Sequence, residues 1–202
     1  MPIVLNSTTV LGSKIGVWKI QESTSYFIQE LGNIAIPEEK LEKRLLEKLA
    51  IRLLVNRILG NKEHQNIAYY ESGKPYIKNS LYFVSFSHKL DYVSVILSTQ
   101  KYTGIDLEEV CEKPIRLLSK FENENDLLEK ELLSNIQRAS LLWSAKECVY
   151  KVYGNKELDF KKHITIENKD KKIIGHVHKE KHQVNIPLDY HFFDNMVLVN
   201  TH

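Results

Sequence analysis

The fold and the site are best predicted from one stretch, Trp143-Ser144-Ala145-Lys146-Glu147-Cys148-Val149-Tyr150-Lys151. At about 100° per residue, its apolar side chains and those flanking it form one stripe of a helix. The stripe consists of Leu141, Ala145, Cys148, Val149 and Val152. The opposite face carries Trp143, Glu147 and Lys151 at successive i, i+4 positions. We therefore predict an amphipathic helix with a ring, a carboxylate and an ammonium in a row away from the core.

A Glu and a Lys four positions apart are often only a solvated pair on a helix surface. A second stretch, Gly104-Ile105-Asp106-Leu107-Glu108, favours a functional interpretation. In a strand, Asp106 and Glu108 project from the same face and repel each other unless a cation or solvent separates them. With Glu147 on a nearby helix, they would offer three oxygen ligands to Mg²⁺, a metal that also holds phosphate. The alternative for this pair is plain surface exposure.

Composition limits the class of protein. The 202 residues, 43% of them hydrophobic, suffice for one domain of good size or two small halves that share a core. The chain has 28 basic and 26 acidic residues, so its charge does not demand a nucleic-acid partner. Residues 1–12 lack the pattern of a secretory leader, and no apolar run approaches the length of a membrane span. We expect no membrane association.

The two cysteines, Cys111 and Cys148, have no metal-ligand spacing. A reduced, cytoplasmic setting is the simplest expectation for them. Cys148 falls on the apolar stripe of the predicted helix, and we therefore expect it in the core and not as a nucleophile.

The first half of the chain is predicted to combine strands with one long helix. Residues 14–20 form a first strand. Pro37 at the first helical position, the acids Glu38 and Glu39 behind it, and leucines continuing to Gly60 predict the helix. A short strand over residues 67–70, a turn over 71–75, and a hairpin of strands 82–87 and 92–97 follow. Because residues 104–108 come directly after this hairpin, we predict them as the next strand of its sheet.

Several basic side chains of this half are candidates for an anionic ligand. The long helix carries more base than a solvated face needs, although solvation of part of it remains the alternative. These residues are Lys40, Lys43, Arg44, Lys48, Arg52 and Arg57. Lys74 in the turn and His88 at a strand end are either exposed or phosphate donors.

The second half copies the first in part. At an offset of 94 residues, Gly60-Asn61-Lys62-Glu63 falls on Gly154-Asn155-Lys156-Glu157, and the agreement extends backward into both helices. The fold class predicted is therefore α+β, with two similar subdomains over residues 1–100 and 101–202. Each would pack a long helix on a small, mostly antiparallel sheet, and a pseudo-two-fold axis would relate them. Only the second half has the carboxylates, which predicts a single site.

The remaining segments are predicted from local pattern. Residues 163–167, 173–178 and 196–200 alternate as strands. His176, His178 and His182 suggest a metal site or, more simply, a solvated sheet edge. Residues 111–135 are polar and rich in Glu, with a break at Pro114, and are predicted to form a flap or loop with a short helix.

Two separated stretches of the chain resemble the paired signature of the 4'-phosphopantetheinyl transferase superfamily: residues 104–108, and residues 143–147 with Lys151. Supporting elements occur in family order. They are Pro37-Glu38-Glu39-Lys40 with Lys43, then Gly73-Lys74-Pro75, then Ser85-Phe86-Ser87-His88. The resemblance spans about residues 37 to 160, and length and repeat resemble the monomeric Sfp-type members. The chain departs from the family pattern at Lys89, where a serine is usual, and in its carboxy-terminal strands.

The resemblance implies transfer of the phosphopantetheine arm of coenzyme A to a serine of an apo acyl or peptidyl carrier protein. It implies Asp106, Glu108 and Glu147 as ligands of Mg²⁺, with Mn²⁺ as a substitute, Glu147 as the catalytic base and Lys151 as the group that assists the leaving group. It implies a further set of contacts with coenzyme A. This set comprises Lys40, Lys43, Arg52, Gly73, Lys74, Pro75, Ser87, His88 and Lys151. The subdomain 1–100 would then provide phosphate contacts, the subdomain 101–202 the metal and the carboxylates, and the protein would be a cytoplasmic monomer.

The chemistry independently needs such groups, because displacement at phosphorus accumulates negative charge that cations stabilise. Two other functions stay open. A metal-dependent nuclease also uses acids with a following lysine, but such sites usually alternate on a strand, whereas Glu147 and Lys151 are spaced for a helix. The second alternative function is that of a non-catalytic paralogue that binds coenzyme A or a carrier protein. A nucleic-acid-binding helix over residues 40–57 is a weaker possibility because it lacks interleaved aromatic residues.

Overall fold

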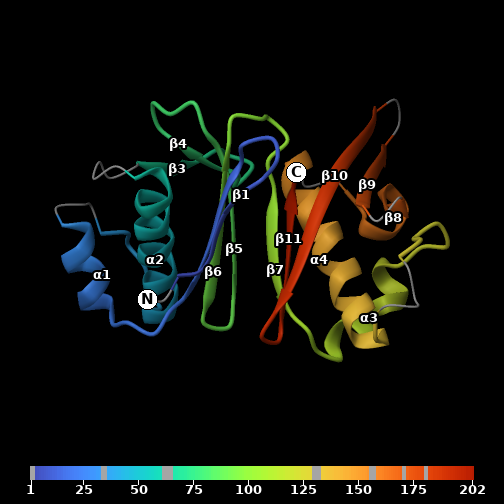
Figure 1. Ribbon diagram of the computed structural model, residues 1–202, viewed down its shortest axis with the longest axis horizontal. Helices are drawn as coiled ribbons and strands as arrows, with labels where there is room; N and C mark the ends of the chain where they lie inside the picture. The colour runs from blue at the N-terminus through green and yellow to red at the C-terminus, as the bar shows by residue number, and fades with distance from the viewer. Residues whose placement is uncertain are drawn as a thin grey trace. The chain divides into compact units, whose positions relative to one another are not determined.

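The computed structural model describes residues 3–32, 36–60, 66–128, 133–154, 158–169, 172–179 and 182–202. The chain forms two compact units, Met1–Lys101 and Tyr102–His202. Each unit combines helices with an antiparallel sheet, which confirms the predicted α+β class (Figure 1). The pseudo-two-fold relation between the halves stays a prediction. No helix in the described ranges has the length and apolar character needed to cross a membrane.

Unit 1 is a four-stranded antiparallel sheet with two helices and a small separate hairpin. The sheet has the order β1 (Ile3–Thr8), β2 (Lys14–Lys19), β6 (Tyr92–Ser98), β5 (Phe83–Lys89). The other elements are α1 (Thr24–Leu31), α2 (Glu42–Leu59), β3 (Ile67–Tyr69) and β4 (Pro75–Ile77). The predicted strand at residue 14, the hairpin of β5 with β6 and the strand at residue 67 are confirmed. The sequence reading missed β1, α1 and β4.

The long helix of unit 1 begins later than predicted. It starts at Glu42 and not at Pro37, and Lys40 therefore precedes it. The acids expected in its first turn do not cap it, because the Glu39 carboxylate instead pairs with Lys48 Nζ at 2.7 Å, along the side of the helix. Its end is as predicted, since Gly60 adopts a left-handed conformation with φ 68°.

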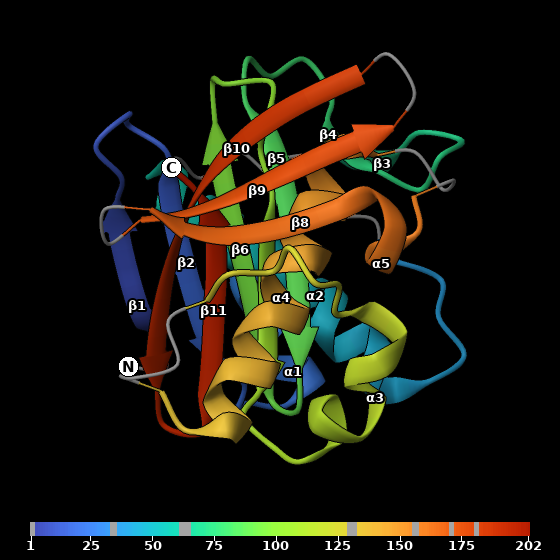
Figure 2. The ribbon, with the colours of Figure 1, turned by 90° about the vertical axis from the view of Figure 1, so that its right-hand side faces the viewer.

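Unit 2 consists of a five-stranded antiparallel sheet that packs on one long helix. The sheet has the order β7 (Ile105–Glu109), β11 (Met196–Thr201), β10 (His182–Phe193), β9 (Lys172–Lys179), β8 (Ile164–Lys169). The helices are α3 (Lys113–Phe121), α4 (Asn135–Tyr153) and α5 (Phe160–His163). Figure 2 shows β8, β9 and β10 curving over α4. The predicted apolar stripe of α4 is confirmed, because all of its members, Cys148 included, lie in the core. Burial raises the pKa of the Cys148 thiol.

Two predictions about strand positions are wrong, and one strand was missed. β7 does not continue the sheet of β6, because β2 and β5 occupy both sides of β6 and β7 pairs with β11. β9 is not a solvated edge, because it lies between β10 and β8. Its His176 contacts Asn185 on one neighbouring strand and Glu167 on the other, and the side chain of His182 lies outside the described part. Strand β10, with Pro187 near its middle, was not predicted at all.

The segment predicted as a flap is largely fixed in place. Pro114 does not break a helix but stands in the first turn of α3. Beyond α3, the Asn123 side chain donates to the carbonyls of Lys161 and Ile164, and Asp126 Oδ1 accepts from the backbone N–H of Ile166. Residues 129–132 lie outside the described part.

The repeated tetrapeptides are only partly described. Asn61–Glu63 and Asn155–Glu157 lie outside the described residues. The glycine that opens each copy is described, and Gly60 and Gly154 play the same part. Both end a long helix in a left-handed conformation, with φ 68° and 71°. Both also donate their backbone N–H to the carbonyl four residues earlier.

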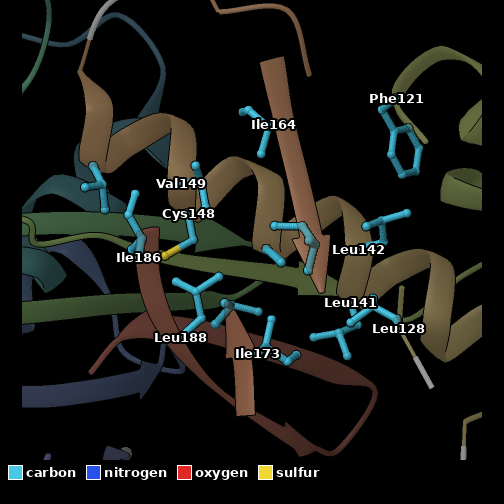
Figure 3. Close-up of a cluster of buried hydrophobic side chains, with 14 of the residues drawn as sticks. Phe121, Leu128, Leu141, Leu142, Cys148, Val149, Ile164, Ile173, Ile186 and Leu188 are labelled. Atoms are coloured by element: carbon cyan, nitrogen blue, oxygen red, sulfur yellow. The ribbon is translucent and has the colours of Figure 1, made fainter. Parts of the chain in front are cut away.

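The core of unit 2 leaves no room for a side chain at Gly175. Its neighbours Val149 and Leu188 belong to the buried cluster shown in Figure 3. A Cβ at this position of β9 would lie 2.2 Å from Cγ2 of Val149 on α4. We expect Gly175→Ala to lower the free energy of unfolding by about 1–3 kcal/mol because of this overlap. Chemical denaturation measures the loss, and adding Val149→Ala should restore part of it. A double variant no more stable than Gly175→Ala alone would contradict this explanation.

Candidate functional site

The site is built on Asp106, a carboxylate of β7 that is only 3% exposed. Two side chains of α4 hold it: Ser144 Oγ donates to Oδ2 at 2.8 Å, and Lys151 Nζ donates to Oδ1 at 2.7 Å. Ser144 and Lys151 are seven positions apart and therefore share one face of the helix. Lys151 also donates to the carbonyl of Ile105 at 3.0 Å. The packing of α4 along β7 thus places a carboxylate and an ammonium in direct contact.

Glu108, the second carboxylate of β7, is oriented by Trp143. The indole Nε1 donates to Glu108 Oε1 at 3.3 Å. The indole ring itself packs against two phenyl rings, with centroid distances of 5.1 Å to Phe121 and 5.4 Å to Phe160. Because Trp Nε1 only donates and a carboxylate only accepts, this bond holds the Glu108 carboxylate toward α4.

Glu147 lies one helical turn from both Trp143 and Lys151 and is half-buried. Burial, followed by the charge of Asp106 and then that of Glu108, raises the pKa of Glu147 to about 7, against the lowering effect of Lys151. Asp106, Glu108 and Lys151 therefore all lie close enough to act on the charge of Glu147.

A groove of about 550 Å³ opens beside Glu147. Aromatic side chains, among them Phe121, Trp143, Tyr150 and Phe160, form much of its wall. The carboxylate of Glu147 thus borders a partly apolar hollow in which a hydroxyl-bearing group can be held against it.

The residue types of this cluster suit a hard divalent cation. Asp106, Glu108 and Glu147 offer only oxygen donors, and their mutual repulsion is the property that a divalent cation would relieve. Within the described ranges, however, no three Asp, Glu, His or Cys residues are already arranged around one cation position. Lys151 currently occupies Oδ1 of Asp106. A cation would therefore have to share this carboxylate with the ammonium.

The predicted ligand-binding residues of unit 1 lie on three of its elements. Lys43 and Arg52 are on α2, with Lys40 just before it, and Ser87 and His88 are near the end of β5. In the turn between β3 and β4, Gly73 has φ 86°, a conformation that favours glycine, Lys74 follows it, and Pro75 begins β4.

Three of these basic groups are partly desolvated or paired. Burial lowers the pKa of Arg52 and that of Lys74, and the charge of Lys101 adds to the effect at Lys74. A bound anion would offset this cost. His88 is exposed, and its Nδ1 lies 3.4 Å from Oε2 of the nearly buried Glu47 on α2. Two of the remaining basic groups on α2 pair with acids of unit 1, Lys48 with Glu39 and Arg57 with Glu30.

Sequence reasoning missed three residues next to the site: Ser144, Lys146 and Asp126. Lys146 is fully buried and paired with Asp126 at 2.7 Å. A signal was present, because Leu142, Lys146 and Val149 follow the i, i+4, i+7 spacing of a core stripe. Nothing local marked Asp126, which lies in a polar segment 20 residues earlier in the chain.

The comparisons with known proteins give one relative. No family model matches the chain. A segment of 117 residues is 31% identical to the 4'-phosphopantetheinyl transferase gsp of Aneurinibacillus migulanus, covering 55% of this chain and 48% of that protein. The chain thus spans about half the length of the curated relative that it matches.

Proposed function

We propose that this protein transfers the 4'-phosphopantetheine group of coenzyme A to a serine of an apo acyl or peptidyl carrier protein and releases adenosine 3',5'-bisphosphate. The observation that carries the proposal is the cluster at β7 and α4. There, Lys151 contacts Asp106 at 2.7 Å, and Glu147 lies within electrostatic reach of both. The similarity to a 4'-phosphopantetheinyl transferase supports the same reaction.

Each residue of the cluster has a role in the proposed reaction. The serine oxygen attacks the phosphorus that carries the pantetheine arm, the bond from this phosphorus to the bridging oxygen breaks, and the bridging oxygen leaves with the adenosine bisphosphate. Glu147, directly or through water, accepts the serine proton. Lys151 stabilises the charge that develops on the leaving oxygen. Asp106 keeps the Lys151 ammonium in place.

Asp106, Glu108 and Glu147 would hold Mg²⁺, or Mn²⁺ in its place. The metal would neutralise charge on the pyrophosphate. Trp143 keeps Glu108 oriented for this role through its bond to Oε1. In unit 1, the proposal assigns contacts with coenzyme A to Lys40, Lys43, Arg52, Lys74, Ser87 and His88, with backbone contacts at Gly73 and Pro75. The desolvation of Arg52 and Lys74 supports an anionic ligand there.

The proposal is tested by incubating the protein with coenzyme A, Mg²⁺ and a panel of apo carriers from fatty-acid, polyketide and nonribosomal-peptide synthesis. Mass spectrometry should show the phosphopantetheine mass on the carrier serine, and a carrier with this serine replaced by alanine should stay unmodified. An established transferase serves as the control for carrier competence. Failure of every carrier that the control modifies would refute the proposal.

Removal of divalent cations should stop the transfer. We expect EDTA to abolish product formation and excess Mg²⁺ or Mn²⁺ to restore it, because the three carboxylates would otherwise repel the pyrophosphate. Calorimetry with coenzyme A separates the alternatives: binding without transfer indicates a non-catalytic paralogue. Cleavage of DNA in Mg²⁺ would instead indicate a nuclease.

A further inference from the structure

Lys146 is fully buried in α4, and its ammonium is surrounded by oxygen atoms. Nζ lies 2.7 Å from the carbonyl oxygen of Phe121, 2.8 Å from that of Ile164, 3.0 Å from that of Phe160 and 2.7 Å from Oδ2 of Asp126. An ammonium has three N–H groups, and these partners use all of them. Lys146 therefore has no donor left for a substrate, although it is adjacent to Glu147 in the sequence.

The carbonyls that Lys146 holds belong to three different elements. Phe121 ends α3, Phe160 begins α5 and Ile164 begins β8. Two of these residues, Phe121 and Phe160, also pack their rings on Trp143, at centroid distances of 5.1 and 5.4 Å. The ammonium thus fixes the backbone that carries both rings in contact with the indole.

Asp126 has a different part in this arrangement. Its Oδ1 accepts from the backbone N–H of Ile166 and its Oδ2 from that of Asn123, both at 2.8 Å. The carboxylate therefore keeps two backbone donors without Lys146. It balances the buried positive charge, whereas the lysine makes the contacts that lead to Trp143.

We propose that Lys146 is a positioning residue: by tying the ends of α3 and α5 to α4, it holds the Trp143 indole so that its N–H stays on Glu108. The series of contacts runs from Lys146 through the two phenylalanines to Trp143 and on to the Glu108 carboxylate, 3.3 Å away. The kinetic consequence of this inference rests on the proposed transferase function. The structural consequence does not.

The structural consequence is tested by ¹⁹F NMR of protein labelled with 5-fluorotryptophan. The chain has two tryptophans, so the resonance of Trp143 is assigned from a Trp143→Phe variant, and Trp18 of unit 1 serves as an internal reference. In Lys146→Met/Asp126→Asn, which removes both charges together, the Trp143 resonance should shift or broaden while that of Trp18 stays. Asp126→Asn alone keeps the Lys146 side chain beside its three carbonyl partners and should leave both resonances in place.

A matched control exists on α5. Lys161 is exposed, and its Nζ donates to the carbonyl of Ser119 at 2.8 Å, so Lys161→Met removes a surface contact between α5 and α3 while it leaves the buried contacts of Lys146 in place. It should change neither resonance. An unchanged Trp143 resonance in the double variant, or an equal shift in Asp126→Asn alone, would overturn the positioning role. If the double variant does not fold, Lys146→Arg, which keeps a charged donor, should retain the native Trp143 resonance, and a shifted one overturns the role.

The kinetic consequence is tested by a cycle of variants in the Asp126→Asn background. We expect Lys146→Met to lower kcat about tenfold or more, as the loss of a group that orients a ligand residue commonly does, with KM for coenzyme A changed less than about threefold. Trp143→Phe should cost a similar factor. The two together should cost no more than the larger single loss, because both break the same series of contacts.

Losses that multiply would show that Lys146 acts independently of Trp143, and the inference would fail. A Lys146 variant with wild-type kcat would refute it as well. Absence of transfer by the wild-type protein would refute the proposed function instead, and the ¹⁹F resonances would still decide whether Lys146 positions Trp143.

Discussion

Glu147→Gln is expected to lower kcat for phosphopantetheine transfer on the order of 10²-fold or more, with the fold intact. The amide keeps the size of the side chain but neither accepts a proton nor carries the charge that a divalent cation needs. The position is half-buried and the substitution removes a carboxylate that repels Asp106 and Glu108, so stability should not fall. Product formation is followed by mass spectrometry, and the thermal transition by circular dichroism.

A matched control for this variant is Glu124→Gln, an exposed acid of the same unit outside the site. It should transfer at the wild-type rate. Two outcomes of the Glu147→Gln experiment would contradict this prediction. If kcat stays near wild type, then Glu147 is neither base nor essential ligand and the assignment of roles is wrong. If the protein unfolds, the carboxylate is a structural group.

The periodic parts of the fold were predictable from the sequence because each follows one local rule. The apolar stripe of α4 and the apolar run of β6 are strong patterns, and the left-handed glycine at Gly60 marks a helix end by its conformational freedom. The start of α2 was not predictable in this way. Pro37 is compatible with the first turn of a helix. In the folded chain, however, the residues before Glu42 run beside α2, where Glu39 contacts Lys48, and this contact depends on tertiary structure.

The sequence predicts where a strand lies better than it predicts which strand it pairs with. Nothing in residues 104–108 tells that β7 pairs with β11, about 90 positions later in the chain, instead of with the preceding hairpin. Strand β10 was hidden by Pro187 and by its mixed polarity. Its place between β9 and β11 is stabilised by ladders on both sides, which only the folded chain reveals.

In the candidate site, too, some residues were predictable from the sequence and others were not. Asp106, Glu147 and Lys151 were predicted as site residues from residue type and spacing. In the structure Lys151 contacts Asp106, and both act on the charge of Glu147. Their supports, Ser144 and Lys146, come from the same helix but face buried partners. Whether a buried polar side chain has a partner cannot be inferred from helix period alone, because the partner is supplied by other elements.

Lys146→Met alone is expected to lower the free energy of unfolding by about 3–5 kcal/mol, because it leaves the carboxylate of Asp126 buried without its cation. The side chains of both residues have no exposed surface, so solvent cannot replace the lost partner. Burial lowers the pKa of Lys146, against the raising effect of Asp126, which shows that the carboxylate offsets a cost the ammonium bears in the core. Urea denaturation followed by circular dichroism measures the change.

Adding Asp126→Asn to Lys146→Met should recover part of this loss, because no unpaired charge then remains in the core. The introduced amide keeps an oxygen that can accept from the backbone N–H of Ile166, whereas the three carbonyls around position 146 still lack their donor. Recovery should therefore be incomplete. A double variant as unstable as Lys146→Met would place the cost in the lost carbonyl contacts, and full recovery would place it in the ion pair. The geometry around Nζ predicts a result between these limits, with both contributions measurable in one set of variants.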